Sequence, residues 1–213
     1  MRGERLTENA ENLEEQEQGY PFGAELPVAT ADGEGDTELA PPVQHSPGEL
    51  VVPDDYGVLE GSPNGARRGV AVVVARFNGD VTTRLLESAL AELERAGVGK
   101  DVITVVPVPG AFELPIAAMA FAKTRRYGCV VALGCVIRGE TPHFDYVAGE
   151  AASGLQLAAL ETGVPVAFGV LTVDTPEQAE ARVDKGAEAV RTALEMADLF
   201  AQLRTSHAAA TPK

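Results

Sequence analysis

Four continuous apolar runs of strand length, each followed by a segment with helical periodicity, set the strongest limit on how this chain can fold. The runs cover residues 70–75, 102–108, 129–137 and 164–171. Strands that are apolar on both sides are typical of a parallel sheet with both faces covered. The sequence therefore predicts an α/β fold of three αβα layers, with a four-stranded parallel sheet between helices.

The first two intervening segments have the spacing and the end signals of helices. Apolar residues recur at helical spacing from about Asp80, and Gly97 is a typical helix stop. The next helix is expected from Pro115 to about Lys123, because proline is well suited to a first helical turn.

The later helices have similar signals. Thr141 is expected to be the N-cap of a helix over residues 142–160, with Pro142 as its first residue. A capping-box pattern that begins at Thr175 predicts the start of a further helix. The helix then resumes after residues 185–186 and is expected to end near Leu203.

The topology predicts where a ligand would bind. Right-handed crossovers bring every loop that follows a strand to the same edge of the sheet, and ligands bind outside the carboxyl ends of such strands. We call this side the carboxyl edge. Phe77 and residues 111–113, 137–143 and 168–175 are expected to meet there.

The loop after the third apolar run is the strongest candidate for chemistry. Gly139, Glu140 and Thr141 form a polar turn before a helix, where free amides and the helix dipole favour an anion such as phosphate. His143 follows in the first helical turn and is a candidate acid or base. An ordinary strand–helix junction with a capping threonine would explain the same pattern.

Three further residues of the carboxyl edge have competing explanations. Phe77 is either a core residue or a platform for a planar heterocycle. Glu113 either caps its helix or binds hydroxyl groups. Arg182, expected on an otherwise acidic helix beside Glu177 and Glu180, is either a solvated ion-pair former or a phosphate ligand.

The formal charge of −15 is unevenly distributed. Residues 1–64 carry 15 Asp and Glu but only Arg2 and Arg5, whereas residues 65–213 carry 17 Asp and Glu and 15 Lys and Arg. We therefore expect an acidic, disordered N-terminal extension over 1–64, dispensable for folding and catalysis, and one domain over 65–213. Within the extension, residues 50–52 are either a solvated linker or an added edge strand.

Composition also excludes several classes of protein. The negative charge argues against nucleic-acid and anionic-membrane partners. Cys129 and Cys135 lie about 20 Å apart along one predicted strand and cannot form a disulfide with each other. Few histidines and no Cys-x-x-Cys pair argue against a metal site. No apolar stretch has transmembrane length and no targeting segment is evident, which predicts a cytoplasmic protein.

Taken together, the loops of the carboxyl edge resemble the motifs of the 6,7-dimethyl-8-ribityllumazine synthase family, whose members catalyse the penultimate step of riboflavin biosynthesis. The resemblance covers about residues 69–203 and does not include residues 1–64. Four motifs carry it: RFN at 76–78, PGAFELP at 109–115, GCVIRGETPHFDYV at 134–147 and FGVLTVDTPEQA at 168–179.

The resemblance implies a flavodoxin-like fold and a cofactor-free transferase. Members of the family condense 5-amino-6-(D-ribitylamino)uracil with 3,4-dihydroxy-2-butanone 4-phosphate, giving 6,7-dimethyl-8-ribityllumazine, phosphate and water. The resemblance also implies a homopentamer, in some members assembled into an icosahedral shell, and a functional link to riboflavin synthase. Two alternatives stay open: an archaeal-type riboflavin synthase, and a non-catalytic flavin-binding or shell-forming relative.

Site residues follow from the same resemblance. His143 is the proton-transferring residue, Glu140 and Thr141 belong to the phosphate-binding turn, and Arg182 reaches the phosphate from a neighbouring subunit. The residues that hold the ribitylaminouracil are Phe77, Ala111, Phe112, Glu113, Cys135, Val136, Ile137 and, from the neighbour, Phe168.

Two positions depart from the family pattern. Only Val183 and Asp184 separate Arg182 from Lys185, where the family has a longer glycine-containing loop. Glu140 places a carboxylate in the phosphate turn, so only its backbone N–H is suited to bind phosphate.

Overall fold

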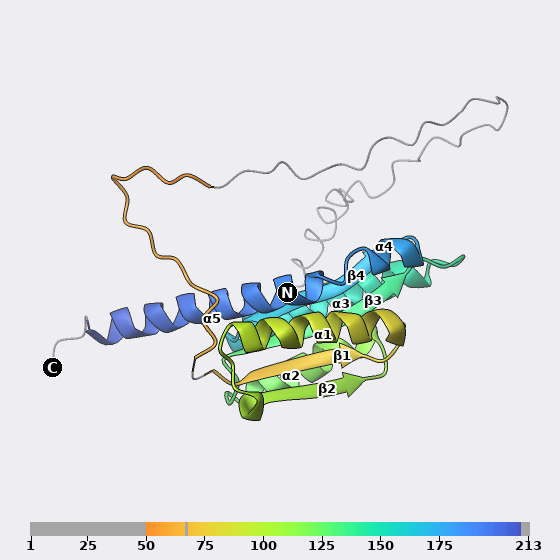
Figure 1. Cartoon of the computed structure of the whole chain (residues 1–213), viewed down its shortest axis with the longest axis horizontal. Helices are drawn as coiled ribbons and strands as arrows, with labels where there is room; N and C mark the ends of the chain where they lie inside the picture. Colours follow the sequence, from red (N-terminus) through yellow and green to blue (C-terminus); the bar gives the residue numbers. More distant parts are fainter. Residues whose placement is uncertain (1–49, 67, 210–213) are drawn as a thin grey trace, which may run out of the picture. The chain divides into compact units, whose positions relative to one another are not determined.

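A four-stranded parallel sheet forms the middle layer of the structure (Figure 1). The strands are β1 (Val70–Ala75), β2 (Ile103–Val108), β3 (Cys129–Ile137) and β4 (Val166–Val173). In space they follow the order β2-β1-β3-β4, and every neighbouring pair is parallel. This is the flavodoxin-like order, in which sheet growth reverses between β1 and β3. The computed structural model describes residues 50–66 and 68–209, with side chains described as far as Thr205.

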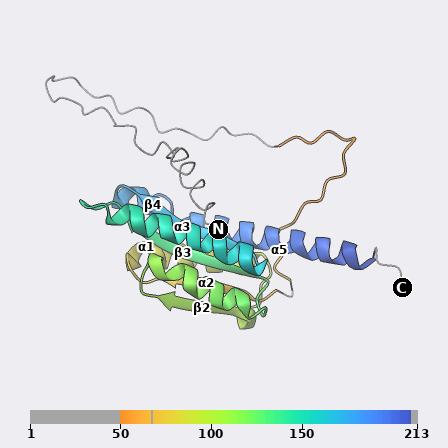
Figure 2. The ribbon, with the colours of Figure 1, turned by 180° about the vertical axis from the view of Figure 1, so that it is seen from behind.

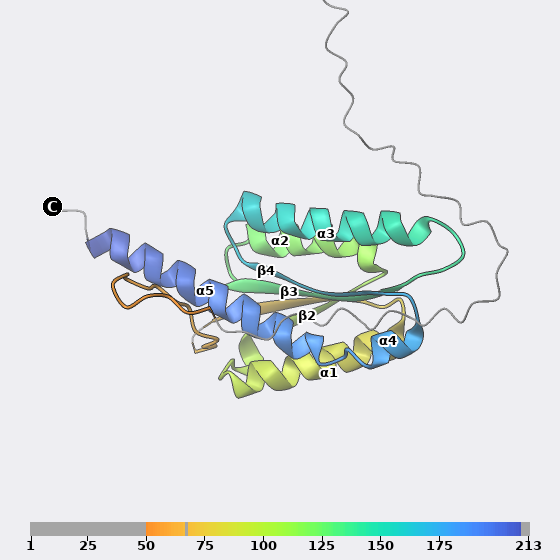
Figure 3. The same cartoon turned by 90° about the horizontal axis from the view of Figure 1, so that it is seen from above.

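Helices cover both faces of the sheet, as the sequence predicted. They are α1 (Gly79–Arg95), α2 (Leu114–Lys123), α3 (His143–Thr162), α4 (Pro176–Glu180) and α5 (Lys185–Ala209), with short 3-10 turns η1 (Lys100–Val102) and η2 (Ala111–Glu113). Figure 3 shows α2 and α3 on one side of the strands and α1 and α5 on the other. Figure 2 shows the α2–α3 side from the front. None of the helices in the described part of the chain has both the length and the apolar composition to cross a bilayer.

Each face of the sheet has its own apolar core. Leu93 of α1 and Leu194 of α5 are fully buried against one face, and Leu114 of α2 and Leu155 of α3 against the other. All residues of β1 are buried, which explains why that strand is apolar without alternation. Burying one leucine side chain contributes roughly 1.5–3 kcal/mol, so both helical layers are needed to hold the strands in place.

The fourth strand begins and ends two residues later than predicted. The expected run was 164–171, whereas β4 spans Val166–Val173. Pro165 delays the start because it has no N–H for the ladder, although its carbonyl accepts the N–H of Val130 at 2.8 Å. The strand continues through the polar Thr172 because β4 is an edge strand and Thr172 is exposed on it.

Smaller differences occur in the other elements. Val102, predicted to begin the second strand, ends η1 instead. The last helix passes its predicted end near Leu203 and continues to Ala209. Thr175 is the N-cap of α4, as predicted, and its hydroxyl accepts the N–H of Gln178 at 3.3 Å.

The start of α3 differs from the prediction in a way that affects the site. Thr141 was expected to cap the helix and Pro142 to be its first residue. The helix begins at His143 instead, because Pro142 has ψ of −1° and the helical pattern starts one residue later. Pro142 therefore occupies the cap position and makes no side-chain cap hydrogen bond. The first amides of α3 are left open.

The predicted N-terminal extension is described only in part, since residues 1–49 lie outside the described residues. Residues 50–52 form no strand, so the alternative of an added edge strand in this chain is wrong. Leu50 and Val51 are strongly exposed.

Residues 60–64, which the sequence assigned to the extension, contact α5. The N–H of Ser62 donates to Asp198 Oδ2 at 3.1 Å, and Gln202 Nε2 donates to the carbonyl of Glu60 at 2.9 Å. Arg68 forms an ion pair with the same Asp198 at 2.6 Å. The chain is therefore anchored on α5 before it enters β1.

We predict that Gly186→Ala lowers the free energy of unfolding by about 1–3 kcal/mol, because α1 and α5 leave no room for a side chain. A Cβ at Gly186 would lie 2.2 Å from the carbonyl oxygen of Leu85. Gly79→Ala is the matched control, because Gly79 also lies in a first helical turn but a Cβ added there would have no atom within 4 Å. Urea unfolding of both variants measures the difference. Equal stability of the two would contradict this account of the α1–α5 contact.

Candidate functional site

The ends of β1, β2 and β3 are tied together at the carboxyl edge. The N–H of Phe77, just after β1, donates to the carbonyl of Pro109, just after β2, at 3.1 Å. Asn78 Nδ2 donates to the carbonyl of Cys135 near the end of β3 at 2.9 Å. The second bond crosses the point between β1 and β3 where the strand order reverses, which is where ligands bind in sheets of this kind.

Asn78 was part of a motif in the sequence but had no role assigned to it. Its backbone is left-handed, with φ 56° and ψ 48°, a conformation that asparagine tolerates better than most residues. This turn directs the side chain back across the sheet toward Cys135. A signal was available, because an asparagine in the turn after a buried strand is typical of this conformation.

Phe77 and Phe112 are large apolar side chains that are exposed at this edge. Phe77 is 70% exposed, so the explanation that it is a core residue is wrong. Phe112 is 56% exposed and lies in η2, directly after β2. An exposed aromatic ring beside a ligand crevice is suited to stack on a planar heterocycle.

Glu113 caps its own turn in this structure. Its Oε2 accepts the N–H of Gly110 at 2.9 Å, which closes the short η2 helix over Ala111. Glu113 is also the N-cap residue of α2, but its side chain makes no cap hydrogen bond to that helix, so it caps the preceding turn η2 rather than the helix expected from the sequence. The side chain is only half-buried, so the carboxylate also remains available to hydroxyl groups from the crevice.

Cys135, Val136 and Ile137 complete β3 at the carboxyl edge. Cys135 and Val136 are buried, and Ile137 is partly exposed. Burial raises the pKa of the Cys135 thiol to about 11, so this thiol is neutral near pH 7. A ligand at this point therefore meets the strand backbone rather than a reactive thiolate.

Neither cysteine has a partner for a bridge or a metal in the described part of the chain. Cys129 and Cys135 are both free and buried, and burial raises the pKa of Cys129 to about 12. No three His, Cys, Asp or Glu side chains between residues 50 and 205 are grouped as a metal site, residue 67 aside.

The turn at residues 139–141 offers several open backbone donors. In the described part of the chain no protein acceptor bonds the amides of Gly139, Glu140, Thr141, His143 or Phe144. The turn and His143 are exposed. Open amides at the start of a long helix attract anions, because the N–H groups and the positive end of the helix dipole act together.

Phe168 does not lie at the carboxyl edge, contrary to the prediction. It is near the beginning of β4 and pairs with Ala132 in the middle of β3. Its side chain is 46% exposed on the outermost strand. Strand β4 begins two residues later than predicted, which leaves Phe168 closer to its beginning. The larger reason for its distance from the carboxyl edge is that Phe168 lies five residues before the end of the strand at Val173.

Arg182 also differs from its predicted surroundings. It follows the end of α4 and lies in the turn before α5, rather than on an acidic helix. Its Nη1 donates to the carbonyl of Gln178 at 2.9 Å. Glu180 pairs with Arg84 instead, and Arg182 has no ion pair with any described residue. The guanidinium is exposed, as the solvated ion-pair explanation expected, but it forms no ion pair with Glu177 or Glu180.

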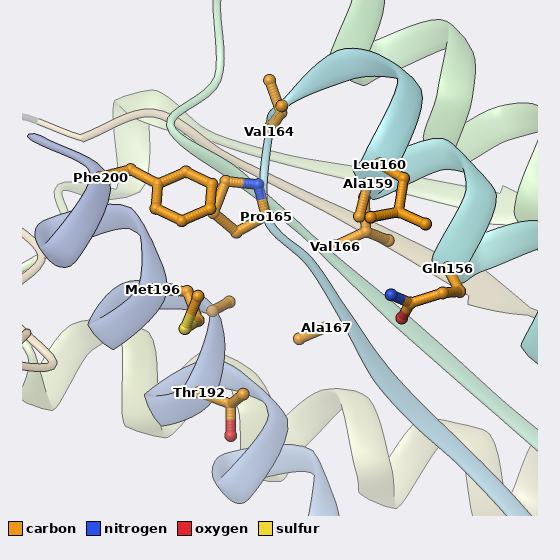
Figure 4. Close-up of a pocket in the computed structure, with 12 residues that line it drawn as sticks. Gln156, Ala159, Leu160, Val164, Pro165, Val166, Ala167, Thr192, Met196 and Phe200 are labelled. Atoms are coloured by element: carbon orange, nitrogen blue, oxygen red, sulfur yellow. The ribbon is translucent and has the colours of Figure 1, made fainter. Parts of the chain in front are cut away.

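A separate apolar groove lies between α3, α5 and the amino-terminal half of β4 (Figure 4). Its volume is about 390 Å³. Met196 and Phe200 of α5 line one wall, and Leu160 of α3 lines the other. None of the predicted site residues lines it, so this groove is distinct from the carboxyl edge.

Comparison with known protein families identifies the chain. A sequence model of the family described as 6,7-dimethyl-8-ribityllumazine synthase matches residues 68–201. The match includes all four strands and every predicted site residue. Together with the flavodoxin-like sheet, it shows that this chain belongs to the 6,7-dimethyl-8-ribityllumazine synthase family, a family of transferase-type enzymes linked to riboflavin biosynthesis.

Proposed function

We propose that this protein condenses 5-amino-6-(D-ribitylamino)uracil, the ribitylaminouracil, with 3,4-dihydroxy-2-butanone 4-phosphate, the ketose phosphate, to give 6,7-dimethyl-8-ribityllumazine. One observation carries the proposal. Open amides and an exposed histidine follow β3, and an exposed aromatic ring follows β1, which are the two strands between which the strand order reverses. Family membership supports the same reaction.

The ribitylaminouracil would bind between the ends of β1, β2 and β3. In this proposal the ring stacks on Phe77, and the backbone at Cys135–Ile137 holds its polar edge. Ala111, Phe112 and Glu113 line the other side, with the Glu113 carboxylate accepting from ribityl hydroxyls. The contact between Asn78 and Cys135 keeps the two walls at a constant separation.

The ketose phosphate would bind at the 139–141 turn. Backbone amides, including those of Glu140 and Thr141, donate to the phosphate oxygens. The Glu140 side chain is exposed and can point away from the anion. Arg182 of a neighbouring subunit adds a planar fork that suits phosphate geometry.

The chemistry needs positioning and proton transfer but no cofactor. The aromatic amine attacks the ketone and water leaves to form an imine, phosphate is eliminated, and ring closure releases a second water. Holding both substrates in one crevice lowers the entropic cost of their meeting. His143 lies beside the phosphate turn, where an imidazole can accept the proton from one step and donate it in the next.

The position of Phe168 supports a site shared between subunits. Phe168 lies on the outermost strand, five residues before its end, while the proposed site is at the ends of β1 and β3. Each strand adds only about 5 Å across a sheet, but Phe168 is displaced along it as well. In a homo-oligomer, Phe168 and Arg182 would serve a neighbour's site. We propose a pentamer, as in the family, with an icosahedral shell as a further assembly.

The direct test is to supply both substrates to the purified protein. Lumazine absorbance and released phosphate should rise together and in equal amounts. Formation of riboflavin from lumazine, without product from this substrate pair, would instead indicate a riboflavin synthase. Tight flavin binding without turnover would indicate a non-catalytic relative, and either result would overturn the proposed function.

His143→Ala should slow turnover by about 10²–10⁴-fold, or by less if the bound substrates react readily unaided, because a general acid and base is lost. Substrate binding should persist, since the amides of the 139–141 turn are unchanged. Steady-state kinetics together with calorimetric titration measures both effects. Glu161→Ala, exposed near the other end of the same helix, is the control. Undiminished turnover of His143→Ala would show that positioning alone is sufficient.

Mixing two variants of strongly reduced activity tests the shared site. His143→Ala and Arg182→Ala are dissociated, combined and reassembled. Some interfaces in the mixed oligomer then join an intact His143 to an intact neighbouring Arg182, so part of the activity should return. Each variant reassembled alone is the control. Mixed assemblies as inactive as the parents would show that both residues serve the same subunit.

A further inference from the structure

Arg138 connects three elements around the 139–141 turn, and the proposed reaction gives it no role. It is the first residue after β3, and its backbone N–H donates to the carbonyl of Val173 at the end of β4, at 2.9 Å. Its Nε donates to Asp174 Oδ1 at 3.0 Å, and its Nη1 donates to Asp145 Oδ1 at 3.2 Å. Asp145 lies in the first turn of α3.

An aromatic contact restrains the same side chain. The guanidinium carbon lies 4.0 Å from the centre of the Phe144 ring, a distance typical of a cation–π interaction. The Arg138 side chain is 45% exposed. A single exposed ion pair contributes little, but two carboxylates and an aromatic face together restrict one guanidinium to one orientation.

These contacts lie on both sides of the open turn. The turn itself has no stabilising hydrogen bond from the amides of Gly139, Glu140 or Thr141 to any described residue. The conformation of the turn must therefore be stabilised by contacts of the residues on either side of it. Arg138 directly follows β3. Its side chain contacts Asp145 in the first turn of α3 and Asp174 just after β4, so it connects the turn to both of these elements.

The charges point to positioning rather than to direct phosphate binding. Asp145 and Asp174 already engage the guanidinium through its Nη1 and Nε groups. Without Arg138, both carboxylates would stand unneutralised beside a phosphate site, which would disfavour the anion. Arg138 thus has two effects on the turn, geometric and electrostatic, and both require that it remain between the two aspartates.

We propose that Arg138 is a positioning residue, which holds the 139–141 turn between β4 and α3 so that its open amides face the phosphate of the ketose substrate. The inference rests on the proposed function for the identity of that substrate. The planar fork of arginine is essential to it, because lysine has one donor centre and cannot bridge Asp145, Asp174 and the Phe144 ring together.

Arg138→Ala should raise KM for the ketose phosphate by about 10–100-fold, because a displaced turn loses its alignment. KM for the ribitylaminouracil should change by less than about twofold, since Phe77 and the end of β3 are untouched. Arg138→Lys should be impaired nearly as strongly. Lys100→Ala, which removes an exposed cation paired with Glu94 away from the turn, should match the wild type.

A binding measurement keeps this inference separate from the proposed reaction. Inorganic phosphate should raise Tm of the wild type and of Lys100→Ala but not of Arg138→Ala or Arg138→Lys. If the wild type makes no lumazine, the reaction is wrong, and the phosphate-dependent Tm still tests Arg138. Wild-type kinetics and phosphate response in Arg138→Lys would show that charge alone suffices. The same result in Arg138→Ala, with circular dichroism confirming its fold, would exclude any role of Arg138 at the turn.

Discussion

The structure depends on the burial of β1 and β3 on both faces. Every residue of β1 is buried, and β3 is buried except for its last residue. Strands of this kind are stable only when helices cover them on each side, and short right-handed crossovers are the connections that place helices there. Such crossovers in turn require all four strands to end at one edge. The location of the candidate site is a consequence of this packing.

The strand order reverses between β1 and β3, and sheets of this kind bind ligands at such a reversal. The candidate residues there come from strand ends and are held by main-chain contacts. Phe77 is bonded through its N–H to Pro109, and Asn78 spans to Cys135. These hydrogen bonds hold the backbone of an aromatic residue and of the strand ends in place, and groups that are fixed before binding lose less entropy when a ligand binds.

The charge near the 139–141 turn is balanced locally. The protein as a whole is strongly acidic, yet the turn combines open amides with a guanidinium that neutralises its two nearest aspartates. An anion that bound at this turn would therefore meet backbone donors, although the protein as a whole is negatively charged. The same arrangement explains why Glu140 is tolerated, because its side chain is exposed and its backbone N–H remains open.

Most of the fold was predictable because its cause is local. Continuous apolar runs determined β1 and β3 to the residue, and helical periodicity with proline and glycine signals determined α1 and α2 closely. The predictions were wrong where contacts with other elements, or a local backbone angle, set the end of a strand or helix. Pairing with β3 and the missing N–H of Pro165 moved β4 by two residues, and the backbone angle at Pro142 moved the start of α3.

The sequence by itself determined the layers of the fold, the edge at which the strands end together and the family motifs, because periodicity and residue type are sufficient for these. Only the tertiary structure decided which side chains meet. It brought Asn78 to Cys135, and Arg138 to Asp145 and Asp174. It also separated Phe168 from the carboxyl edge. Such contacts join residues far apart in the chain, and their geometry depends on strand register and backbone angle, which no local pattern contains.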